Sequence, residues 1–507
     1  MTSLRALGTV AAFSCLAAYG QDRAAVERWV GAHQRQIVGE FAGLLVIPNV
    51  GTDRPNIRRN AEFLSAMLAR HGLNTELLET AGNPLVYAEK NLPGARSTVL
   101  FYIHYDGQPV DPSRWKQEGG PFRPLMRTGR MEDGAKTIAN FAALDRFPDD
   151  WRLYARSASD DKAPIVALMA ALDSLGGKTR ANLHVVLDGE EEMGSPSLTG
   201  AIARYRDKLR ADLLLILDGP VHPNGRPTLA FGARGILTLS LTVYGPKMAL
   251  HSGHYGNWIP NPALRLAQLL ASMKDDQGRS TIEGFYSDVP PLTDAQRLIL
   301  KSVPDDEAGL LKLFGVAHPD AVGESLQEAL QFPSLNIRGM RSGYVDEPRT
   351  IIPPDATAAI DIRLVKETPA ARMLKRLRAH IEKQGYHIVE SEPDDATRLR
   401  YAKLVRLKTT EAEGMEAYRT EPDSPAAVRV TQALERMLGA PPVLIRTMGG
   451  TVPIAPFIRE LGVPAVSVPI VNFDNNQHSD NENLRLGNLW SGIVTLAAML
   501  EMEPAAR

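Results

Sequence analysis

The chain has 507 residues, which is too many for one ordinary hydrophobic core and predicts two or three domains. Apolar residues make up 44% of the chain and charged residues 23%, as in ordinary globular proteins, and we find no internal repeat. The net charge of -2 gives no electrostatic reason to expect nucleic acid or an anionic membrane surface as a partner.

The N-terminus has the pattern of a secretory signal peptide. Arg5 precedes an uncharged, alanine-rich stretch that is too short to span a bilayer. Small residues before Gln21 suit cleavage there, so we expect residues 1–20 to be removed and the mature protein to be periplasmic or secreted. A frayed N-terminal helix and a lipoprotein anchored at Cys15 are the alternatives. Because Cys15 is the only cysteine, a metal site in the mature chain has to use His, Asp and Glu.

Four apolar runs predict buried strands, and polar residues follow each of them. Helical patterns separate the runs, which predicts an α/β domain with a mostly parallel sheet. Ligands of such sheets bind beyond the carboxyl ends of the strands, so we expect the residues that follow the runs to meet at one edge. The runs are STVLFYI before His104, ANLHVVL before Asp188, ADLLLIL before Asp218 and PAVSVPIV before Asn472.

The segment VVLDGEEEMGSPS places four acidic residues within the five positions 188–192. Packing like charges together costs free energy. The cluster is therefore either a solvated acidic loop or a site where a metal cation offsets the repulsion.

Other possible ligands are weak signals when taken singly. An N-cap at the start of the helix near Ala163 explains one of Asp160 and Asp161, although it does not explain both. Asp218 alone could be a turn residue, and His478 alone could be an exposed residue of a polar loop. The recurrence of such residues after successive strands favours a metal site.

The motifs resemble those of the di-zinc exopeptidases and deacylases, a family that includes carboxypeptidase G, the carnosine dipeptidases, aminoacylase and acetylornithine deacetylase. The resemblance covers nearly the whole mature chain and is closest to the carnosine-dipeptidase-like branch. The motifs that carry it are, in order, HYDGQP, WKQEGGPFRP, SASDDKAP, EEMGS, ILDGP, ALHSGHYG, TIIPPDATAAIDIRLV, MGGTVP and QHSDNENL.

The resemblance implies a catalytic site with two divalent metal ions. His104 and Asp218 would hold one ion, Glu192 and His478 would hold the other, and Asp160 would bridge them. Zinc is the expected metal, and manganese or cobalt would also suit carboxylates and two histidines.

The resemblance also assigns roles to the neighbours of these ligands. Asp106 would orient His104 from behind, and Glu191 would be the general base. The peptide bond between Asp160 and Asp161 is expected to be cis. Glu190 is expected to be a bystander near the rim of the site.

After the motif FGARG the pattern changes from buried runs to half-exposed strands. ILTLSLTVYG and ATAAIDIRLV alternate between apolar and polar residues, and helical segments lie between and after them. We therefore expect an α+β insert at 236–418 to interrupt a catalytic domain formed by 21–235 and 419–507, and the resemblance implies that this insert is a lid or dimerisation domain. The charged run DDATRLRYAKLVRLKTTEAEG within the lid is most simply a solvated loop or edge.

The resemblance places substrate-binding residues in and near this lid. Arg363 would bind the free carboxylate of the substrate. The other residues that would contact the substrate are Thr350, Gly450 and Thr451. His251 would donate a hydrogen bond to the oxyanion, from the partner subunit in the dimeric members of the family. The alternatives are a strand arginine that faces solvent and a histidine that caps a turn within its own lid.

The predicted function is metal-dependent hydrolysis of the amide bond in dipeptides or short peptides with a free C-terminal carboxylate. An N-acyl-amino-acid deacylase with the same site is the main alternative. An inactive peptide-binding protein fits less well, because Glu191 and all five expected ligands are present. The sequence contains neither the G-x-S-x-G motif of serine hydrolases nor the H-E-x-x-H motif of single-zinc peptidases.

We also expect a homodimer formed through the lid, and neither a nucleic-acid partner nor a membrane span. Two features depart from the family pattern. Ala155 and Ser157 stand where glycines are usual, and an insertion of about 130–151 near the mouth of the site could alter the choice of substrate.

Overall fold

The structure is a computed structural model that describes residues 6–347, 349–409 and 414–503, with only the helical backbone for 6–22. Residues 1–5 and the side chains of 6–20, which include Cys15 of the expected signal peptide, lie outside the described part. Among the described residues, no helix has both the length and the apolar character that crossing a bilayer requires.

The chain divides into two compact units. Unit 1 comprises Met1–Gly232, Thr420–Arg446 and Pro456–Arg507, and unit 2 comprises Ala233–Arg419 and Thr447–Ala455.

Unit 1 is built around a mixed sheet of eight strands. Its central strands β6, β3, β7 and β19 are parallel to one another, whereas β1 and β2 on one side and β8 on the other pair antiparallel with their inner neighbours. The α/β class is therefore confirmed, with the parallel arrangement concentrated in the centre. The strands in spatial order are β1 (Asn74–Leu78), β2 (Leu85–Lys90), β6 (Asn182–Asp188), β3 (Thr98–His104), β7 (Leu213–Ile216), β19 (Ala465–Ser467), β8 (Thr228–Ala230) and β18 (Val443–Ile445).

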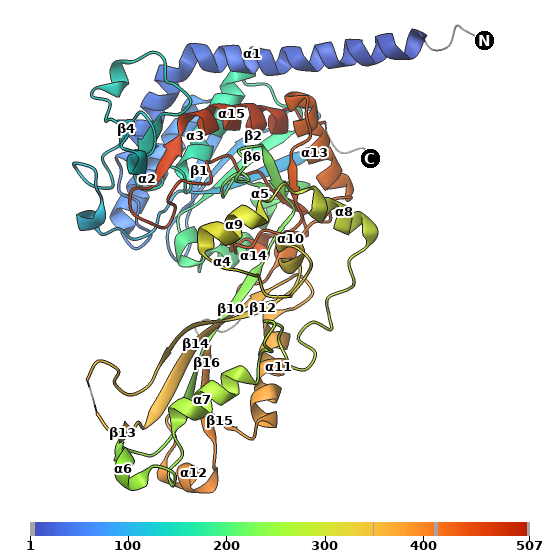
Figure 1. Ribbon diagram of the computed structural model, residues 1–507. Helices are drawn as coiled ribbons and strands as arrows, with labels where there is room; N and C mark the ends of the chain where they lie inside the picture. Colours follow the sequence, from blue (N-terminus) through green and yellow to red (C-terminus); the bar gives the residue numbers. More distant parts are fainter. Residues whose placement is uncertain (1–5, 348, 410–413, 504–507) are drawn as a thin grey trace. The chain divides into compact units, whose positions relative to one another are not determined.

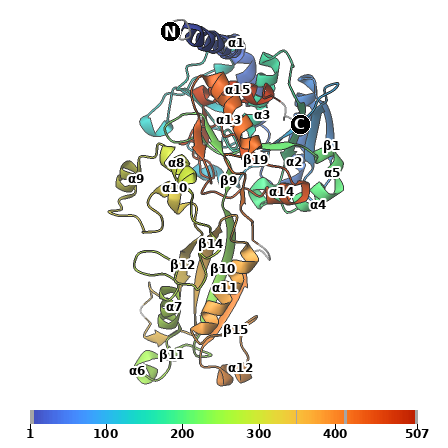
Figure 2. The same cartoon turned by 90° about the vertical axis from the view of Figure 1, so that its right-hand side faces the viewer.

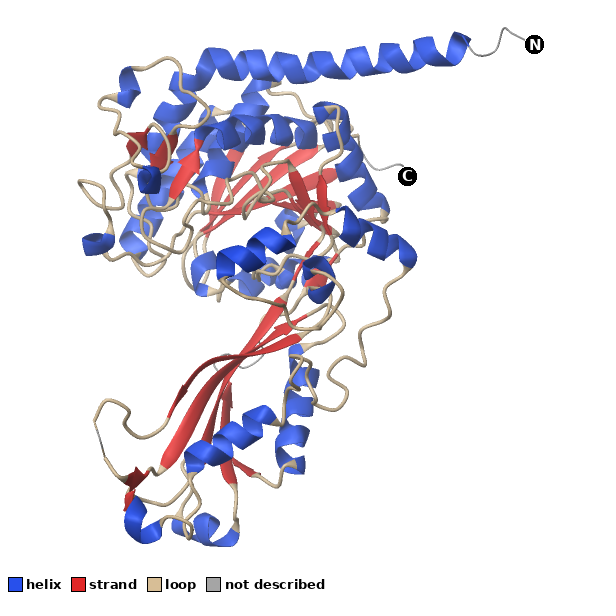
Figure 3. Cartoon of the chain, in the orientation of Figure 1, coloured by secondary structure: helices blue, strands red, loops and turns tan. Residues whose placement is uncertain are grey.

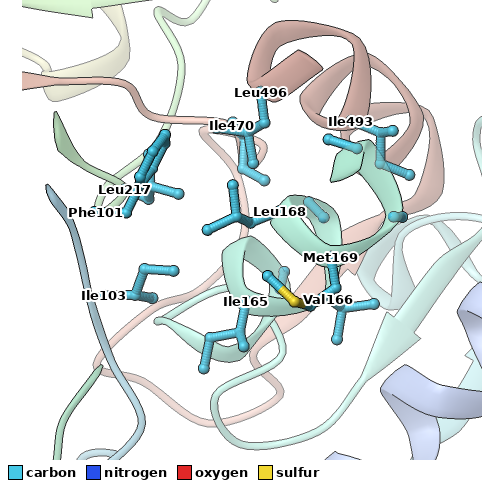
Figure 4. Packing of buried hydrophobic residues seen from close by; sticks show 14 of the residues in the cluster. Phe101, Ile103, Ile165, Val166, Leu168, Met169, Leu217, Ile470, Ile493 and Leu496 are labelled. Carbon is cyan, nitrogen blue, oxygen red and sulfur yellow. The ribbon is translucent and has the colours of Figure 1, made fainter. Parts of the chain in front are cut away.

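Helices cover both faces of the central strands, which explains why these strands are continuously apolar. Phe101 and Ile103 of β3 belong to the same buried cluster as Ile165 on one face (Figure 4). Tyr102 lies on the opposite face, where its ring centroid is 5.6 Å from that of Phe457 in α14. The helices of unit 1 are α1 (Ala6–Leu45), α2 (Arg54–Arg70), α3 (Lys162–Ser174), α4 (Leu198–Arg204), α5 (Arg206–Leu209), α13 (Pro425–Leu438), α14 (Ala455–Leu461) and α15 (Leu486–Leu500).

The ends of these elements bring distant residues to one edge of the sheet. β3 ends at His104 and the adjacent β6 ends at Asp188, while Asp218 follows the end of β7 by two residues. A small sheet of β4 (Leu125–Arg127), β5 (Arg152–Tyr154) and β20 (Asn483–Arg485) joins the segment before α3 to the segment after His478.

Unit 2 contains a five-stranded sheet with helices on one face (Figures 2 and 3). Buried and partly exposed residues alternate along the first part of β10 and β14, so the predicted half-exposed strands are confirmed. The strands in order are β12 (Ser334–Arg341), β14 (Asp355–Leu364), β10 (Gly235–Tyr244), β16 (Leu404–Thr409) and β15 (His387–Val389), with β11 (Leu250–His251) paired to β13 (Ile351–Ile352). The helices are α6 (Ser252–Tyr255), α7 (Pro262–Ala271), α8 (Asp294–Ser302), α9 (Glu307–Phe314), α10 (Leu326–Ala329), α11 (Ala370–Lys383) and α12 (Asp395–Arg400).

The interpretation of the charged run in the lid as a solvated loop or edge was wrong. Its first part forms α12, and β16 lies inside the sheet between β10 and β15. Leu404, Val405 and Leu407 of β16 are buried, and the basic residues among them hid this apolar alternation from the sequence pattern. Residues 410–413 of the run lie outside the described part.

The division into units differs from the expected boundaries by three residues at 232/233, by one residue at 419/420 and by one further segment. Residues 447–455, expected in the second part of the catalytic domain, group with unit 2. A bridge between Ala233 and Met448 and a hydrogen bond between Arg363 and Thr451 hold this segment within unit 2.

Candidate metal centre and active site

The five expected metal ligands come together in unit 1 as two groups of potential ligand atoms. His104, Asp160 and Asp218 form one group, and Asp160, Glu192 and His478 form the other. Within each group the ligand atoms lie within 4.8 Å of one another. The two groups share Asp160, as a bridging carboxylate requires.

The two carboxylate oxygens of Asp160 face different histidines. Oδ1 lies 2.9 Å from Nε2 of His104, and Oδ2 lies 3.1 Å from Nε2 of His478. Nε2 of His478 is also 3.4 Å from Oε2 of Glu192. Asp160 therefore offers one oxygen to each group. The peptide bond between Asp160 and Asp161 is cis, as expected.

Asp161 does not cap the helix that follows it. Asp161 occupies the N-cap position of α3, but its side chain accepts no capping hydrogen bond. Oδ2 of Asp161 instead accepts a hydrogen bond of 3.3 Å from the backbone N–H of His104. The N-cap explanation for this aspartate was therefore wrong, and the side chain fixes the end of β3.

Glu482 holds the turn that carries Asp160. This fully buried carboxylate accepts hydrogen bonds from the backbone N–H groups of Ser157, Ser159 and Asp160, each at 2.9 Å. The Arg156 guanidinium donates to the same carboxylate at 2.8 Å and balances its charge. A turn held at this many points can present both oxygens of Asp160 in one orientation.

Asp106 contacts residues of both ligand groups. Its backbone oxygen lies 3.2 Å and its Oδ1 lies 3.4 Å from Nδ1 of His104. Its two carboxylate oxygens also accept the backbone N–H groups of Glu191 and Glu192, at 3.1 and 3.2 Å. Gln108, from the same HYDGQP motif, donates from Nε2 to Oε2 of Glu192 at 2.6 Å. One short segment therefore orients ligands of both groups.

The four carboxylates of the acidic cluster at 188–192 have two different roles: two of them stabilise the local fold and two belong to the candidate metal site. Asp188 accepts hydrogen bonds from the hydroxyls of Tyr102 and Ser195, at 2.9 and 2.6 Å. Glu190 is buried and accepts the backbone N–H of Asn83 at 2.7 Å, so its placement near the rim was wrong. These two carboxylates brace the turn that carries Glu191 and Glu192.

Burial and mutual repulsion disfavour the charged forms of these site carboxylates. Burial raises the pKa of Glu192 to about 7 and that of Asp218 to about 6, and the charge of Asp160 adds to both shifts. Burial also raises the pKa of Glu191 well above its ordinary value, and the charges of Asp218 and Glu192 contribute. Divalent cations would act in the opposite direction and stabilise the ionised cluster.

The donor set fits metal ions. Each group offers one imidazole nitrogen and carboxylate oxygens, a combination that suits zinc and related divalent metals. Oδ2 of Asp160 is buried and accepts no hydrogen bond, so it is available as a ligand atom. The Asp160 carboxylate, whose Oδ2 lies 3.1 Å from Nε2 of His478, raises the pKa of this imidazole to about 9, so metal binding would release a proton from it.

Comparison with known proteins agrees with this geometry. Residues 100–502 match the family described as peptidase family M20/M25/M40. The chain belongs to this family. The resemblance inferred from the motifs is therefore confirmed, and this M20 protein is a metallopeptidase.

Individual relatives cover most of the M20 protein. It is 27% identical over 482 residues to the Cys-Gly metallodipeptidase DUG1 of Candida albicans, covering 90% of this chain and 92% of the relative. It is also 27% identical over 433 residues to the Beta-Ala-His dipeptidase of Homo sapiens, covering 83% and 77%. The structure of the M20 family metallo-carboxypeptidase Sso-CP2 from Sulfolobus solfataricus superposes with a TM-score of 0.74 at 29% identity, covering 92% and 98%.

The remaining expected site residues of the M20 protein lie in unit 2, where they form two groups. The backbone oxygen of Thr350 accepts the N–H of Ser252 at 2.9 Å, next to His251. Nη1 of Arg363 donates to Oγ1 of Thr451 at 2.9 Å, and Gly450 precedes this threonine. The ring of His251 accepts the N–H of Gly253 at 3.1 Å and so caps α6.

Glu482, Gln108 and Arg156 were missed as site residues, although all three lie in or beside motifs that carry the family resemblance. One sequence feature could have identified them: each is a charged or amide residue within four positions of an expected ligand. Spacing alone could not show that Glu482 reaches back by more than 300 residues to the turn of Asp160.

The insertion at 130–151 contacts the segment that leads to His478. Nε of Arg130 lies 3.5 Å from Oδ2 of Asp474, and Asn476 donates to Oε1 of Glu132 at 3.4 Å. Apolar residues of the insertion pack against the core of unit 1, among them Ile138, Phe141 and Leu144.

Proposed function

We propose that this M20 protein hydrolyses the amide bond of dipeptides or short peptides that have a free C-terminal carboxylate. The observation that carries the proposal is the pair of ligand groups that share Asp160, with Glu191 beside them. The names of the relatives, a Cys-Gly metallodipeptidase and a Beta-Ala-His dipeptidase, support dipeptides as the substrate class.

Two bound divalent cations, which we propose to be zinc, would supply Lewis acidity for the scissile carbonyl and a nucleophilic water at neutral pH. His104 and Asp218 would hold one ion, Glu192 and His478 the other, and Asp160 both. Because Glu192 is used as a ligand, a separate carboxylate has to handle protons.

Glu191 is the residue proposed for that task. Its backbone is fixed by Asp106, and its side chain carries no assignment as a ligand. As general base, Glu191 would take a proton from the attacking water and deliver it to the amine that leaves.

The groups in unit 2 would recognise the substrate. Arg363 would bind the carboxylate through its guanidinium group, with Thr451 holding the arginine in place and Thr350 and Gly450 beside the substrate. His251 would donate to the oxyanion that forms during attack. We propose that the protein is a homodimer through unit 2 and that His251 acts on the site of the partner subunit.

N-acyl amino acids are the second substrate class, because they also present an amide bond next to a carboxylate. The same residues would serve both reactions, so a substrate screen has to separate them.

We also propose that residues 1–20 are a signal peptide, which would place the enzyme in the periplasm or outside the cell. The uncharged stretch after Arg5 and the small residues before Gln21 support this proposal.

The test is a screen of the full-length protein loaded separately with zinc, manganese or cobalt. Dipeptides, their C-terminal amides and N-acyl amino acids would be compared by the rate of amine release. Hydrolysis of free dipeptides at a rate well above the other two classes supports the proposal. Faster hydrolysis of N-acyl amino acids would establish the deacylase instead, and no turnover of any class would overturn both.

A further inference from the structure

Arg234 is a buried arginine immediately before β10, next to the proposed carboxylate-binding arginine. Only 7% of Arg234 is exposed. Its Nη2 donates to the backbone oxygen of Phe332 at 2.7 Å and to Oγ of Ser334 at 3.0 Å. Ser334 pairs directly with Arg363 across β12 and β14. Arg234 therefore contacts Ser334, the residue of β12 that lies directly beside Arg363, and all three residues belong to unit 2.

The partners of Arg234 are neutral. Its Nε is buried and makes no hydrogen bond. Among the described residues, no carboxylate lies within 4.0 Å of its guanidinium group, and only neutral oxygens accept its hydrogen bonds. Burial and the neighbouring charge of Arg363 lower the pKa of Arg234 to about 10, which still leaves it charged at neutral pH.

The local charge balance is positive. Asp361 is the carboxylate of this cluster, and it is shared by Arg363 and Arg338, each at 3.8 Å, and by Asn336 at 2.9 Å. Among the described residues of this cluster, the guanidinium groups of Arg234, Arg338 and Arg363 therefore interact with a single carboxylate. A buried cation without an ion-pair partner costs free energy, and an anion that binds nearby would offset this cost.

We propose that Arg234 and Arg363 together form the anion-recognition site of unit 2, with Arg234 as a specificity-determining residue for the free carboxylate of the substrate. Arg363 is partly exposed and would contact the carboxylate directly. Arg234 lies deeper and supplies positive potential in a position that solvent screens little. This inference rests on the proposed function, of which it names a further recognition residue, and it holds for dipeptides and N-acyl amino acids alike.

Arg234→Met tests the proposal because it removes the charge and keeps a long side chain. In the metal-loaded, full-length protein, kcat/KM for L-alanyl-L-leucine should fall about tenfold or more, mainly through KM. The value for L-alanyl-L-leucinamide should change little, so the preference for the free acid should be lost. Arg234→Lys should restore most of the preference, because it keeps the charge.

Arg398→Met is a matched control: Arg398 lies in α12, beside the opposite end of β10. Arg398 is also largely buried and donates to the backbone oxygen of Gly245, just after the end of β10. The ten residues of β10 span roughly 33 Å, so this change should leave the preference for the free acid intact.

A binding measurement separates this inference from the proposed function. L-leucine should raise the Tm of the metal-loaded wild type more than L-leucinamide at matched ionic strength, and this difference should vanish in Arg234→Met. Neither ligand has to be hydrolysed. If the wild type cleaves no peptide but still distinguishes the two ligands through Arg234, the proposed function fails and the inference stands.

The ligand-free Tm distinguishes recognition from a structural role. Removal of an uncompensated buried charge should leave the Tm of Arg234→Met at or above that of the wild type. A lower Tm, together with equal losses on the acid and the amide, would make Arg234 a structural arginine and overturn the proposal. A wild type that favours neither L-leucine nor L-alanyl-L-leucine over the amides would also overturn it.

Discussion

The two units of this M20 protein concentrate charges of opposite sign, and they assemble them in different ways. Unit 1 gathers carboxylates at the ends of parallel strands, where backbone N–H groups and two histidines surround Asp160. Unit 2 gathers guanidinium groups at one end of the antiparallel strands β10, β12 and β14, around Asp361. An excess of negative charge suits metal cations, and an excess of positive charge suits the carboxylate of a substrate.

Each cluster depends on a different structural relation between strands. In unit 1, adjacent parallel strands end at the same edge, so residues far apart in sequence meet wherever successive strands end. In unit 2, the register of β10, β12 and β14 decides which side chains become neighbours.

The largest effect is expected in the carboxylate cluster. Glu191→Gln should reduce turnover by at least about a hundredfold, because the base is lost, while the metal content stays at two per chain. Metal analysis of the purified variant and steady-state rates check this prediction.

Glu192→Gln is the matched counterpart, because it changes the neighbouring residue and removes a proposed ligand. We expect this variant to lose metal from one group. If instead Glu191→Gln loses metal and Glu192→Gln keeps it, the two roles are exchanged.

The next effect concerns His251 in unit 2. Loss of one oxyanion donor typically reduces turnover by about a hundredfold to a thousandfold, and we expect His251→Ala to fall in this range. Mixing His251→Ala subunits with Glu191→Gln subunits should restore part of the activity, because one site of a mixed dimer would then be complete.

The mixing experiment also decides whether His251 acts within its own chain. The capping hydrogen bond to Gly253 shows that this histidine has a structural partner in its own unit. No recovery of activity, although heterodimers are shown to form, would mean that His251 does not act on the partner subunit.

A smaller loss is expected when the support of Asp160 is removed. Glu482→Gln should weaken metal binding by about 10- to 100-fold, since outer hydrogen-bond partners orient metal ligands. Competition with a chelator measures the metal affinity directly. Glu367→Gln, which alters an ion pair with the buried Arg419 in unit 2, is the control and should leave the metal affinity unchanged.

The substrate preference should respond to Arg363. Arg363→Ala should abolish discrimination against C-terminally amidated peptides, because the guanidinium group pairs only with the free carboxylate. The ratio of kcat/KM for a free and an amidated dipeptide measures this effect. Equal losses on both substrates would instead identify an arginine without a role in carboxylate recognition.

The smallest effect is a change in stability in unit 1, away from both clusters. Burial acts to lower the pKa of His71, but hydrogen bonds to Asp173 and Glu40 outweigh it and raise the pKa to about 9. The folded pKa lies above the unfolded value near 6.5, so this stabilisation is complete below about pH 6.5 and is lost as the pH rises towards 9.

His71→Gln tests this pH dependence. The Tm difference between wild type and variant should be largest near pH 6 and smaller at pH 9. We expect the free energy of unfolding that the charge of His71 contributes near pH 6 to be on the order of 2 kcal/mol. Metal content and turnover should not change. A Tm difference that is constant across this range would show that the charge of His71 does not stabilise the fold.

The amino-acid sequence was enough to predict the central strands, the order of the motifs and, through the family resemblance, the residues of the two ligand groups. Apolar runs that end in His104, Asp188 and Asp218 have to be buried, and their polar ends have to leave the core at one edge. Burial is a strong local constraint, so these strands were predictable from periodicity, whereas the family resemblance of the motifs supplied the ligand groups.

The residues that support these groups could be identified only from the three-dimensional arrangement of the chain. Three features depend on pairing between distant segments. They are the contact of Glu482 with the turn of Asp160, the inclusion of 447–455 in unit 2 and the position of Arg234 beside Arg363. The interior position of β16 likewise depends on its neighbours β10 and β15. Such pairings follow from strand register and from hydrogen bonds between distant segments, which no local pattern of apolar and polar residues specifies.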